Sequence, residues 1–516
     1  MTAIPRLAER ASARLGLLVG LLVVFAAFAA TPVALGAADE FGIESVSSTL
    51  STTEAGRHPD VVNQIKFKPS ATSPVGDIDS LLFQFPAGLL GNRQNIEECP
   101  LQSFSNPFLE PCPVDSQVGT LTFNFYGFPP TEVFREPIYN LPPGEGEFIR
   151  LGFIGVFFPT YVGFSLRSDG DYGVTVRSSN IASYTHIETI TAKVWGVPAD
   201  PSHDTERLTP LEAFFCASQG GVPCEHGGSR ESTAIPVPFM SNPTSCQPMP
   251  FGYETTTYLL PGQVFKASAS APDITDCDKV PFEPSLSFDT TNHKAGAPTG
   301  LEATLKIPQN EGVSTINSST LRSARVELPD GMTVNAAAAD GLAGCTAAEA
   351  GLGVRGPGQC PSDSKLGAAT FVSPNLERPM EGGIYLRTPA PGHLFRFWLI
   401  SNDLGVNLKV AGEVQLDPDT GRLTAVIPQA PQLPAEEIVL RFNGGPRAAV
   451  RNPLSCGTLN AAYELAPWSG NPPATGTAPI TVNEGCNTGG FDPKLSAGTM
   501  DPSAGHFSPF LFDLKR

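Results

Sequence analysis

Apolar and polar residues alternate in short stretches along most of this chain, and Pro or Gly residues separate the stretches. Residues 78–85 form one such stretch, which stops at a Pro-x-Gly turn. A period of two is typical of a β-strand with one buried face. In the second half of the chain the pattern predicts strands at residues 301–307, 324–328, 367–372, 383–387, 395–400, 406–416, 423–427, 438–442, 461–465 and 480–482.

Many short strands with turns between them predict an all-β fold built from β-sandwiches. Pro and Gly, at 51 residues each, break helices and mark turns, and charged residues make up only 16% of the chain. Long solvated helices and coiled coils need more surface charge, so both are disfavoured. One short helix is expected where Thr346 and Glu349 have the spacing of a capping box.

The sequence also repeats itself. The pattern Ala-Gly, nine residues, Lys occurs at residues 55–66, 295–306 and 504–515. Further blocks match without gaps and in the same order, and together they indicate internal duplication. These blocks pair residues 78–92 with 321–335, 112–119 with 360–367, 138–139 with 384–385, 171–177 with 403–409, and 242–246 with 452–456.

The repeats predict the domain organisation. We expect a first repeat at residues 39–282 with an insertion at 199–231, a second repeat at 283–489, and the start of a truncated third repeat at 490–516. Each full repeat is long enough for a pair of immunoglobulin-like β-sandwiches or for one elaborated sandwich. A lone opening strand cannot bury its apolar face, so the tail indicates a truncated product of a longer gene or a segment that pairs elsewhere.

Residues 1–38 have the features of a signal peptide. Arg6, Arg10 and Arg14 precede an uncharged apolar run at residues 15–30, and small residues follow at 34–38. The alternative is an uncleaved membrane anchor, although the run is short of the roughly 20 residues that span a bilayer. We therefore expect a secreted or cell-surface protein, with no membrane contact beyond the signal peptide.

Ten cysteines in an exported chain predict five disulfides. Four cysteines of the first repeat have counterparts in the second, and two further cysteines lie in the insertion. The counterparts of Cys99, Cys112, Cys246 and Cys277 are Cys345, Cys360, Cys456 and Cys486. No Cys-x-x-Cys motif is present, which lowers the odds of a zinc site. The expected pairs are Cys99–Cys112, Cys216–Cys224, Cys246–Cys277, Cys345–Cys360 and Cys456–Cys486.

No catalytic motif is recognisable. The sequence has no Gly-x-Ser-x-Gly elbow, no phosphate loop and no His-Glu-x-x-His helix, so we expect no catalytic residue, no cofactor and no metal. The formal net charge of −18 repels phosphate backbones and argues against nucleic-acid binding. Asp pairs at residues 169–171 and 417–419 offer oxygen ligands for calcium, but neither has a twelve-residue calcium loop, and Asp also favours turns.

The most apolar part of the mature chain is residues 151–164. A membrane-touching or sugar-stacking surface is one interpretation. Residues 395–400 take the same place in the second repeat, so we favour the alternative of buried core strands.

Several blocks of residues 328–470 resemble a group of uncharacterised secreted repeat proteins of high-GC actinobacteria. They include LPDGM, ADGLAGC, CPSDSKLG, GGIYLR, DPDTGRLT, NGGPRAAV and NPLSCG. The resemblance implies export, repetition and a β-rich architecture, and it supplies no active-site residue.

These observations favour an exported structural, adhesive or scaffolding repeat protein that is not an enzyme. The alternatives are a carbohydrate-binding module protein and an exported polysaccharide-acting enzyme. The expected partner is a cell-wall glycan or another surface protein.

Overall fold

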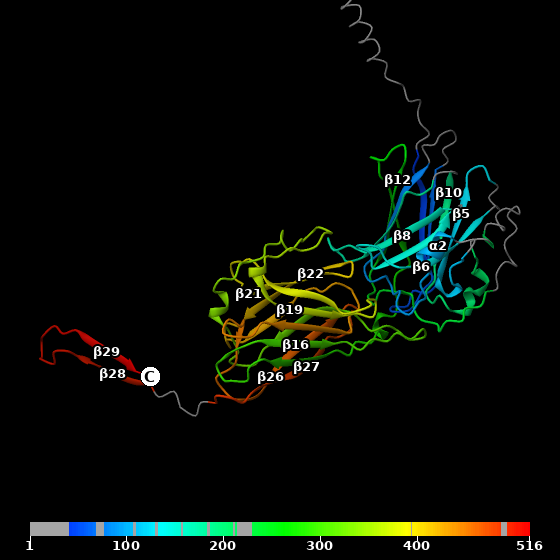
Figure 1. The fold of residues 1–516 in the computed structure, drawn as a ribbon. Helices are drawn as coiled ribbons and strands as arrows, with labels where there is room; N and C mark the ends of the chain where they lie inside the picture. The colour runs from blue at the N-terminus through cyan, green and yellow to red at the C-terminus, as the bar shows by residue number, and fades with distance from the viewer. Residues whose placement is uncertain are drawn as a thin grey trace, which may run out of the picture.

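The computed structural model describes residues 41–68, 77–106, 110–128, 133–155, 158–182, 186–209, 212–213, 230–393, 395–486 and 493–515. The expected signal peptide and the cysteines of the insertion lie outside these residues. Two sheet-built units lie next to each other, and a C-terminal hairpin lies apart from both (Figure 1). Among the described residues no helix has both the length and the apolar character that a membrane span needs.

The first unit is almost entirely strand. Its helical parts are α2 (Leu101–Ser105), η2 (Val114–Ser116), η3 (Pro201–Glu206) and η4 (Cys277–Lys279). Its strands are β1 (Ile43–Leu50), β2 (Val61–Phe67), β3 (Ile78–Gln84), β4 (Leu90–Gly91), β5 (Gln117–Phe125), β6 (Phe134–Leu141), β7 (Ile149–Gly155), β8 (Phe158–Leu166), β9 (Val174–Ser179), β10 (Ile187–Val194), β11 (Met240–Ser241), β12 (Met249–Thr257) and β13 (Phe265–Ala271).

The second unit is likewise built mainly of strands. Its short helices are η5 (Ala336–Ala339) and η6 (Ser362–Ser364). Its strands are β14 (Ser285–Thr290), β15 (Pro298–Thr299), β16 (Leu301–Lys306), β17 (Leu321–Glu327), β18 (Thr333–Val334), β19 (Lys365–Val372), β20 (Met380–Leu386), β21 (Phe395–Asp403), β22 (Val406–Leu416), β23 (Leu423–Ile427), β24 (Glu437–Phe442), β25 (Val450–Arg451), β26 (Gly457–Pro467) and β27 (Ala474–Val482).

The strand order of the two units is the same. Each forms one antiparallel eleven-stranded sheet, ordered β1-β2-β10-β5-β6-β7-β8-β9-β3-β12-β13 in the first and β14-β16-β24-β19-β20-β21-β22-β23-β17-β26-β27 in the second. Two unrelated chains would not share eleven positions of one order by chance, so the fold itself is duplicated. The all-β sandwich class is thereby confirmed.

Each sheet curls until its outer strands meet. In the first unit β1 and β13 lie side by side, and the ring of Phe41, just before β1, packs edge-on against that of Phe265 at 5.0 Å. In the second unit β14 lies beside β27 in the same way. The curl covers the edge strands, which would otherwise offer unpaired backbone groups to other chains.

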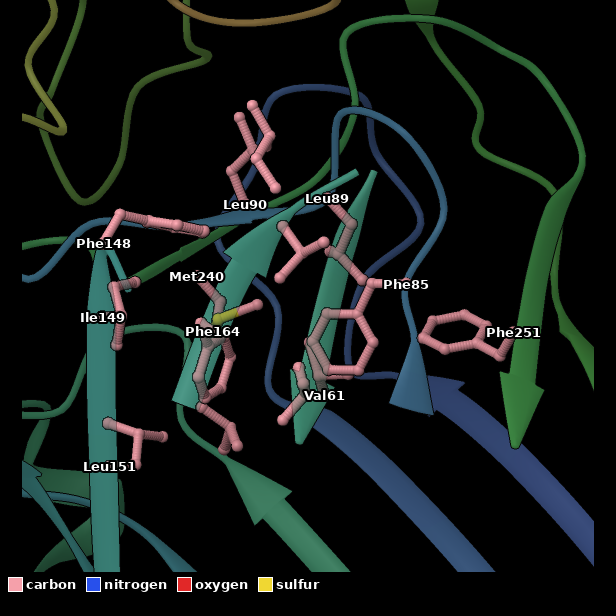
Figure 2. Close-up of a cluster of buried hydrophobic side chains, with 14 of the residues drawn as sticks. Val61, Phe85, Leu89, Leu90, Phe148, Ile149, Leu151, Phe164, Met240 and Phe251 are labelled. Atoms are coloured by element: carbon pink, nitrogen blue, oxygen red, sulfur yellow. The ribbon is translucent and has the colours of Figure 1, made fainter. Parts of the chain in front are cut away.

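The alternating residues of the strands fill the interior. Phe85 packs against Phe251 and Phe164, with ring centroids 5.6 and 6.3 Å away, and Leu89 and Met240 close the same cluster (Figure 2). Residues 151–164 contribute buried Leu151, Phe153 and Phe164 to this core, as the core-strand interpretation expects. Phe158 and Tyr161 on β8 are instead exposed.

The C-terminal hairpin consists of β28 (Lys494–Thr499) and β29 (Phe510–Lys515). Its register, from Lys494 opposite Lys515 to Thr499 opposite Phe510, equals that of β14 and β16, which runs from Ser285 opposite Lys306 to Thr290 opposite Leu301. The equivalent residues Leu301 and Leu305 are buried, whereas Phe510 and Leu514 are 68% and 64% exposed. The hairpin thus has the geometry of β14 and β16, which begin the second sheet, but its apolar side chains are not covered by other strands.

Strand expectations for the second unit agree closely with these bounds, and β22 and β23 are reproduced to the residue. The expected helix at Thr346 is wrong. The capping-box hydrogen bonds between Thr346 and Glu349 form, but the residues that follow make only a hydrogen-bonded turn. Gly351 and Gly353, both with positive φ, end the helical path before a second turn.

Candidate functional site between the two sheet units

The Asp pairs considered for calcium are already engaged by the protein. Asp169 binds Arg355 at 3.0 Å, and Asp171 binds Arg167 at 2.8 Å. Asp417 accepts two backbone hydrogen bonds inside its own turn. Over the described part of the chain no three His, Cys, Asp or Glu side chains converge as a metal site. The sequence Cys224-Glu225-His226 offers further metal ligands, although a disulfide between Cys224 and Cys216 is the favoured interpretation; these residues lie outside the described part.

Eight of the ten cysteines are described, and the structure joins them as Cys99–Cys112, Cys246–Cys277, Cys345–Cys360 and Cys456–Cys486. Their Cα atoms lie 5.1 to 5.9 Å apart, within the range of unstrained bridges. These are the four pairs that the duplication predicts. Cys216 and Cys224 are outside the described residues, so their pairing stays a prediction.

The first disulfide of each unit encloses a small core on the outer face of the sheet. In the first unit Phe104 of α2 fills this space and lies against Gly152, where a Cβ atom would come within 2.5 Å of the Phe104 ring. In the second unit the ladder register aligns Trp398 with Gly152, and Ala350 stands five residues after its cysteine as Phe104 does. The large aromatic side chain of this small core therefore comes from α2 in the first unit, as Phe104, and from a strand in the second, as Trp398.

Removing the Cys345–Cys360 bridge by replacing both residues with Ala should lower the free energy of unfolding by about 3 kcal/mol from its loop alone. Cys345 is buried beside Trp398, so lost packing adds to that value. The matched control is the Cys456–Cys486 pair, which closes a longer loop but is exposed. Urea unfolding should rank the first double variant as less stable; the reverse order would mean that loop length alone sets the effect.

A polar cluster in the first unit was missed at the level of sequence. The ring of His203 stacks on Trp195 at 4.6 Å, and the guanidinium of Arg207 lies 5.1 Å from the Trp195 ring centroid. Lys193 binds Glu206 at 2.9 Å. Except for Trp195 and Lys193, these residues belong to the insertion 199–231, so this part of the insertion is a docked structural element. The signal available in the sequence was the density of ionisable residues at 200–207.

Charges in this cluster support one another. Burial opposes ionisation of Asp60, but hydrogen bonds from His203 and the Gly196 amide, together with the nearby positive charge of Lys193, hold the pKa of Asp60 below its usual value. Burial likewise opposes the charge on Lys193, but Glu206 and Asp60 outweigh it and raise the pKa of Lys193. The carboxylates and the ammonium of this cluster form an ion-pair network that attaches the start of the insertion to the sheet.

The two units meet along a boundary, here called the seam, which includes Tyr172 of the first unit and Lys409 of the second. The hydroxyl of Tyr172 accepts a hydrogen bond from the backbone N–H of Lys409 and donates one to its C=O, each at 2.9 Å. The ammonium of Lys409 is buried and donates to the carbonyls of Gly351 and Val354. Burial lowers the pKa of Lys409, and the charge of Asp169 offsets only part of this effect.

Further contacts extend along the seam. The Gln432 amide donates to the Ser245 hydroxyl at 2.9 Å, and both side chains are almost fully buried. Gly88 has a φ of +85°, and a Cβ atom there would lie 2.6 Å from the Gln432 amide, so only glycine fits. Asn375 donates to the carbonyl of Gly91 at 2.7 Å. These bonds join segments that are far apart in the sequence.

Two adjoining hollows lie at the seam. One is an apolar cavity of about 260 Å³ inside the second sheet, closed at one end by Leu90, Phe148 and Leu166 of the first unit. The other, of about 90 Å³, is lined mainly by amide and hydroxyl side chains of both units. Leu90, Asn375 and Pro434 border both hollows. Together the two hollows give the seam room for a ligand.

Comparisons with known proteins add little to this geometry. No protein-family model and no curated protein matches the chain. Among solved structures, the C-terminal domain of the Streptococcus agalactiae antigen I/II polypeptide BspA matches at 9% identity, with 85% of this chain and 100% of that chain covered and a TM-score of 0.20. The Enterococcus faecalis surface protein ACE matches at 8% identity, with 86% and 96% covered and a TM-score of 0.18.

The C-terminal domain of the Streptococcus pyogenes antigen I/II-family protein AspA matches at 8% identity, with 85% and 99% covered and a TM-score of 0.19. TM-scores this low establish neither a common topology nor a common function. The fold class rests on the strand ladders themselves.

Proposed function

We propose that the chain is an exported structural or adhesive protein of the cell surface, which acts through a rigid body of two sheet units and performs no catalysis. The observation that carries this proposal is the seam. One apolar cluster includes residues of both units, among them Phe148 and Leu151 of the first and Phe371 and Met380 of the second. Two units that share a core resist reorientation under load better than two units on a linker.

The covalent links support the same role. Each unit carries two disulfides among its described residues, and such bonds persist outside the cytoplasm. Duplicated, cross-linked sheets suit a load-bearing or presenting body.

The test uses cells of the source organism that lack the gene and are complemented with wild type or with Gln432→Lys. Lys at this position introduces a charge where the side chain is 4% exposed, and it should separate the units. We expect antibody to label intact wild-type cells, and we expect the seam variant to reach the surface but to lose cell adhesion. Protein that stays in the cytoplasm, or release of reducing ends from cell-wall polysaccharide by the purified protein, would refute the proposal.

Carbohydrate binding is the second candidate, and one observation favours it. Tyr161 on β8 is 40% exposed and is held by the ring of Phe104 and the guanidinium of Arg150. Aromatic faces fixed in this way suit stacking on a sugar ring. A glycan array that captures the wild type but not Tyr161→Ala would support it.

A further inference from the structure

Several core side chains of the second unit are smaller than their counterparts in the first unit. The ladders align a row of four core positions, which reads Tyr253, Phe83, Val176 and Phe164 in the first unit. The same row reads Tyr463, Val326, Ala425 and Val414 in the second. Three of the four side chains are smaller, and Phe85 is likewise replaced by Leu328.

The apolar cavity of about 260 Å³ lies where this bulk is missing, because Val326, Leu328, Val414 and Ala425 all line it. Phe395 and Phe397 on β21 are larger than their counterparts, but they leave the space open. An apolar cavity of about 150 Å³ already stays dry and binds benzene, so a cavity of this size is suited to hydrocarbon.

The adjoining polar hollow contains buried groups that lack partners. They are Nε2 of Gln94, Oδ1 of Asn317 and Oγ1 of Thr320, and Thr320 is only 7% exposed. Asn242 also has an Oδ1 without a partner here. Its counterpart Asn452 in the second unit has the same feature, so this atom reflects the fold that the two units share and does not indicate a ligand. The other three have no such counterpart among the described residues, and buried polar atoms without partners are costly unless something binds them.

The charge of the polar hollow limits what it accepts. Its lining contains Asn, Gln, Ser and Thr side chains and one carboxylate, Glu311, and it contains no Lys or Arg. An anionic headgroup would find no counter-charge there. A neutral group with hydroxyls satisfies both the donor of Gln94 and the acceptor of Asn317.

We propose that the two hollows together bind one amphiphile, with its single hydrocarbon chain in the second sheet and its uncharged, hydroxyl-bearing headgroup between the units, as in an acyl or alkyl glycoside. Leu90 and Pro434 at the junction pack on the chain where it leaves the sheet, and Asn375 contacts the start of the head. The site is independent of the structural role proposed above.

Binding is measured by titration calorimetry of the full chain with octyl glucoside below its critical micelle concentration. Two comparison probes are used. Octanoate has a hydrocarbon tail of similar length but a charged head, and glucose has no tail. We expect saturable binding of octyl glucoside, at least tenfold weaker binding of octanoate, and no binding of glucose. Absence of octyl glucoside binding, or equal binding of octanoate, would overturn the proposal.

Two variants locate the ligand. Val326→Phe with Val414→Phe copies the residues of the first unit, fills the cavity and should weaken octyl glucoside binding at least tenfold. Ala324→Leu is the milder substitution if the double variant fails to fold. Thr320→Val should weaken binding about fivefold, the value of one hydrogen bond, whereas the exposed control Thr333→Val should leave it unchanged. Wild-type affinity in a folded, filled variant would show that the tail does not enter the sheet.

Discussion

Replacing Trp398 with Ala should lower the free energy of unfolding of the second unit by about 3–5 kcal/mol. The side chain is 2% exposed and fills the small core beneath the Cys345–Cys360 bridge. Its indole N–H donates to the Cys345 carbonyl, and the guanidinium of Arg387 lies 4.0 Å from the ring centroid. Truncation therefore removes packing, a buried hydrogen bond and a cation–π contact together. Urea unfolding followed by circular dichroism measures the loss.

The comparison between units supplies the matched control. Trp398→Gly with Ala350→Phe recreates the first-unit arrangement of Gly152 and Phe104, so the double variant should be more stable than Trp398→Gly alone. The reciprocal pair in the first unit, Gly152→Trp with Phe104→Ala, should likewise be more stable than Gly152→Trp alone. Neighbouring residues couple by roughly 0.5–3 kcal/mol. Strictly additive effects in both units would contradict a compensating exchange.

Replacing Arg207 with Ala should destabilise the first unit by about 3–5 kcal/mol, because it removes one partner from a buried ion pair. Arg207 is 1% exposed, binds Asp204 at 3.1 Å and donates to the Pro198 carbonyl. Its loss leaves the Asp204 carboxylate without its charge partner and uncovers the face of Trp195. Thermal unfolding, followed by the fluorescence of the tryptophans, detects the change.

Arg230 is the control for this prediction. It is also in the insertion and pairs with Glu212 at 3.2 Å, but its side chain is 41% exposed. Exposed pairs contribute about 1 kcal/mol or less, so Arg230→Ala should be nearly neutral. Equal effects of the two substitutions would mean that charge, and not burial, determines the stability of the docked insertion.

Much of the fold was predictable because its signals are local. The alternation of residues 406–416 and 423–427 marks two strands, and the turn between them contains Asp, Pro and Gly. Strand β14, in contrast, was not anticipated. Its apolar residues Leu286 and Phe288 alternate with Ser285, Ser287 and Asp289, so the period of two was present in the sequence and was overlooked. What the sequence did not show is that β14 lies at the edge of its sheet, pairs with β16 and meets β27 when the sheet curls.

The candidate site was predictable only in its parts. The turns at Asp171-Tyr172-Gly173 and Asp403-Leu404-Gly405 have a matching sequence. The first joins β8 to β9 and the second joins β21 to β22, which are not equivalent places in the two strand orders, so the predicted equivalence of residues 171–177 and 403–409 is wrong. Both hold a non-glycine residue at positive φ, namely Tyr172 and Leu404. Nothing in the match indicates that Tyr172 binds the backbone of Lys409 in the other repeat, because a duplicated sequence does not specify how its copies pack.

The amino-acid sequence by itself determined the β-rich class, the duplication and the four described disulfide pairs, because period, repetition and cysteine count are properties of a chain read in order. Only the tertiary structure decided the seam, the exchange between Phe104 and Trp398, and the hollow in the second sheet. Each of these depends on side chains that meet from strands distant in sequence, and their fit is a matter of volume and burial in three dimensions.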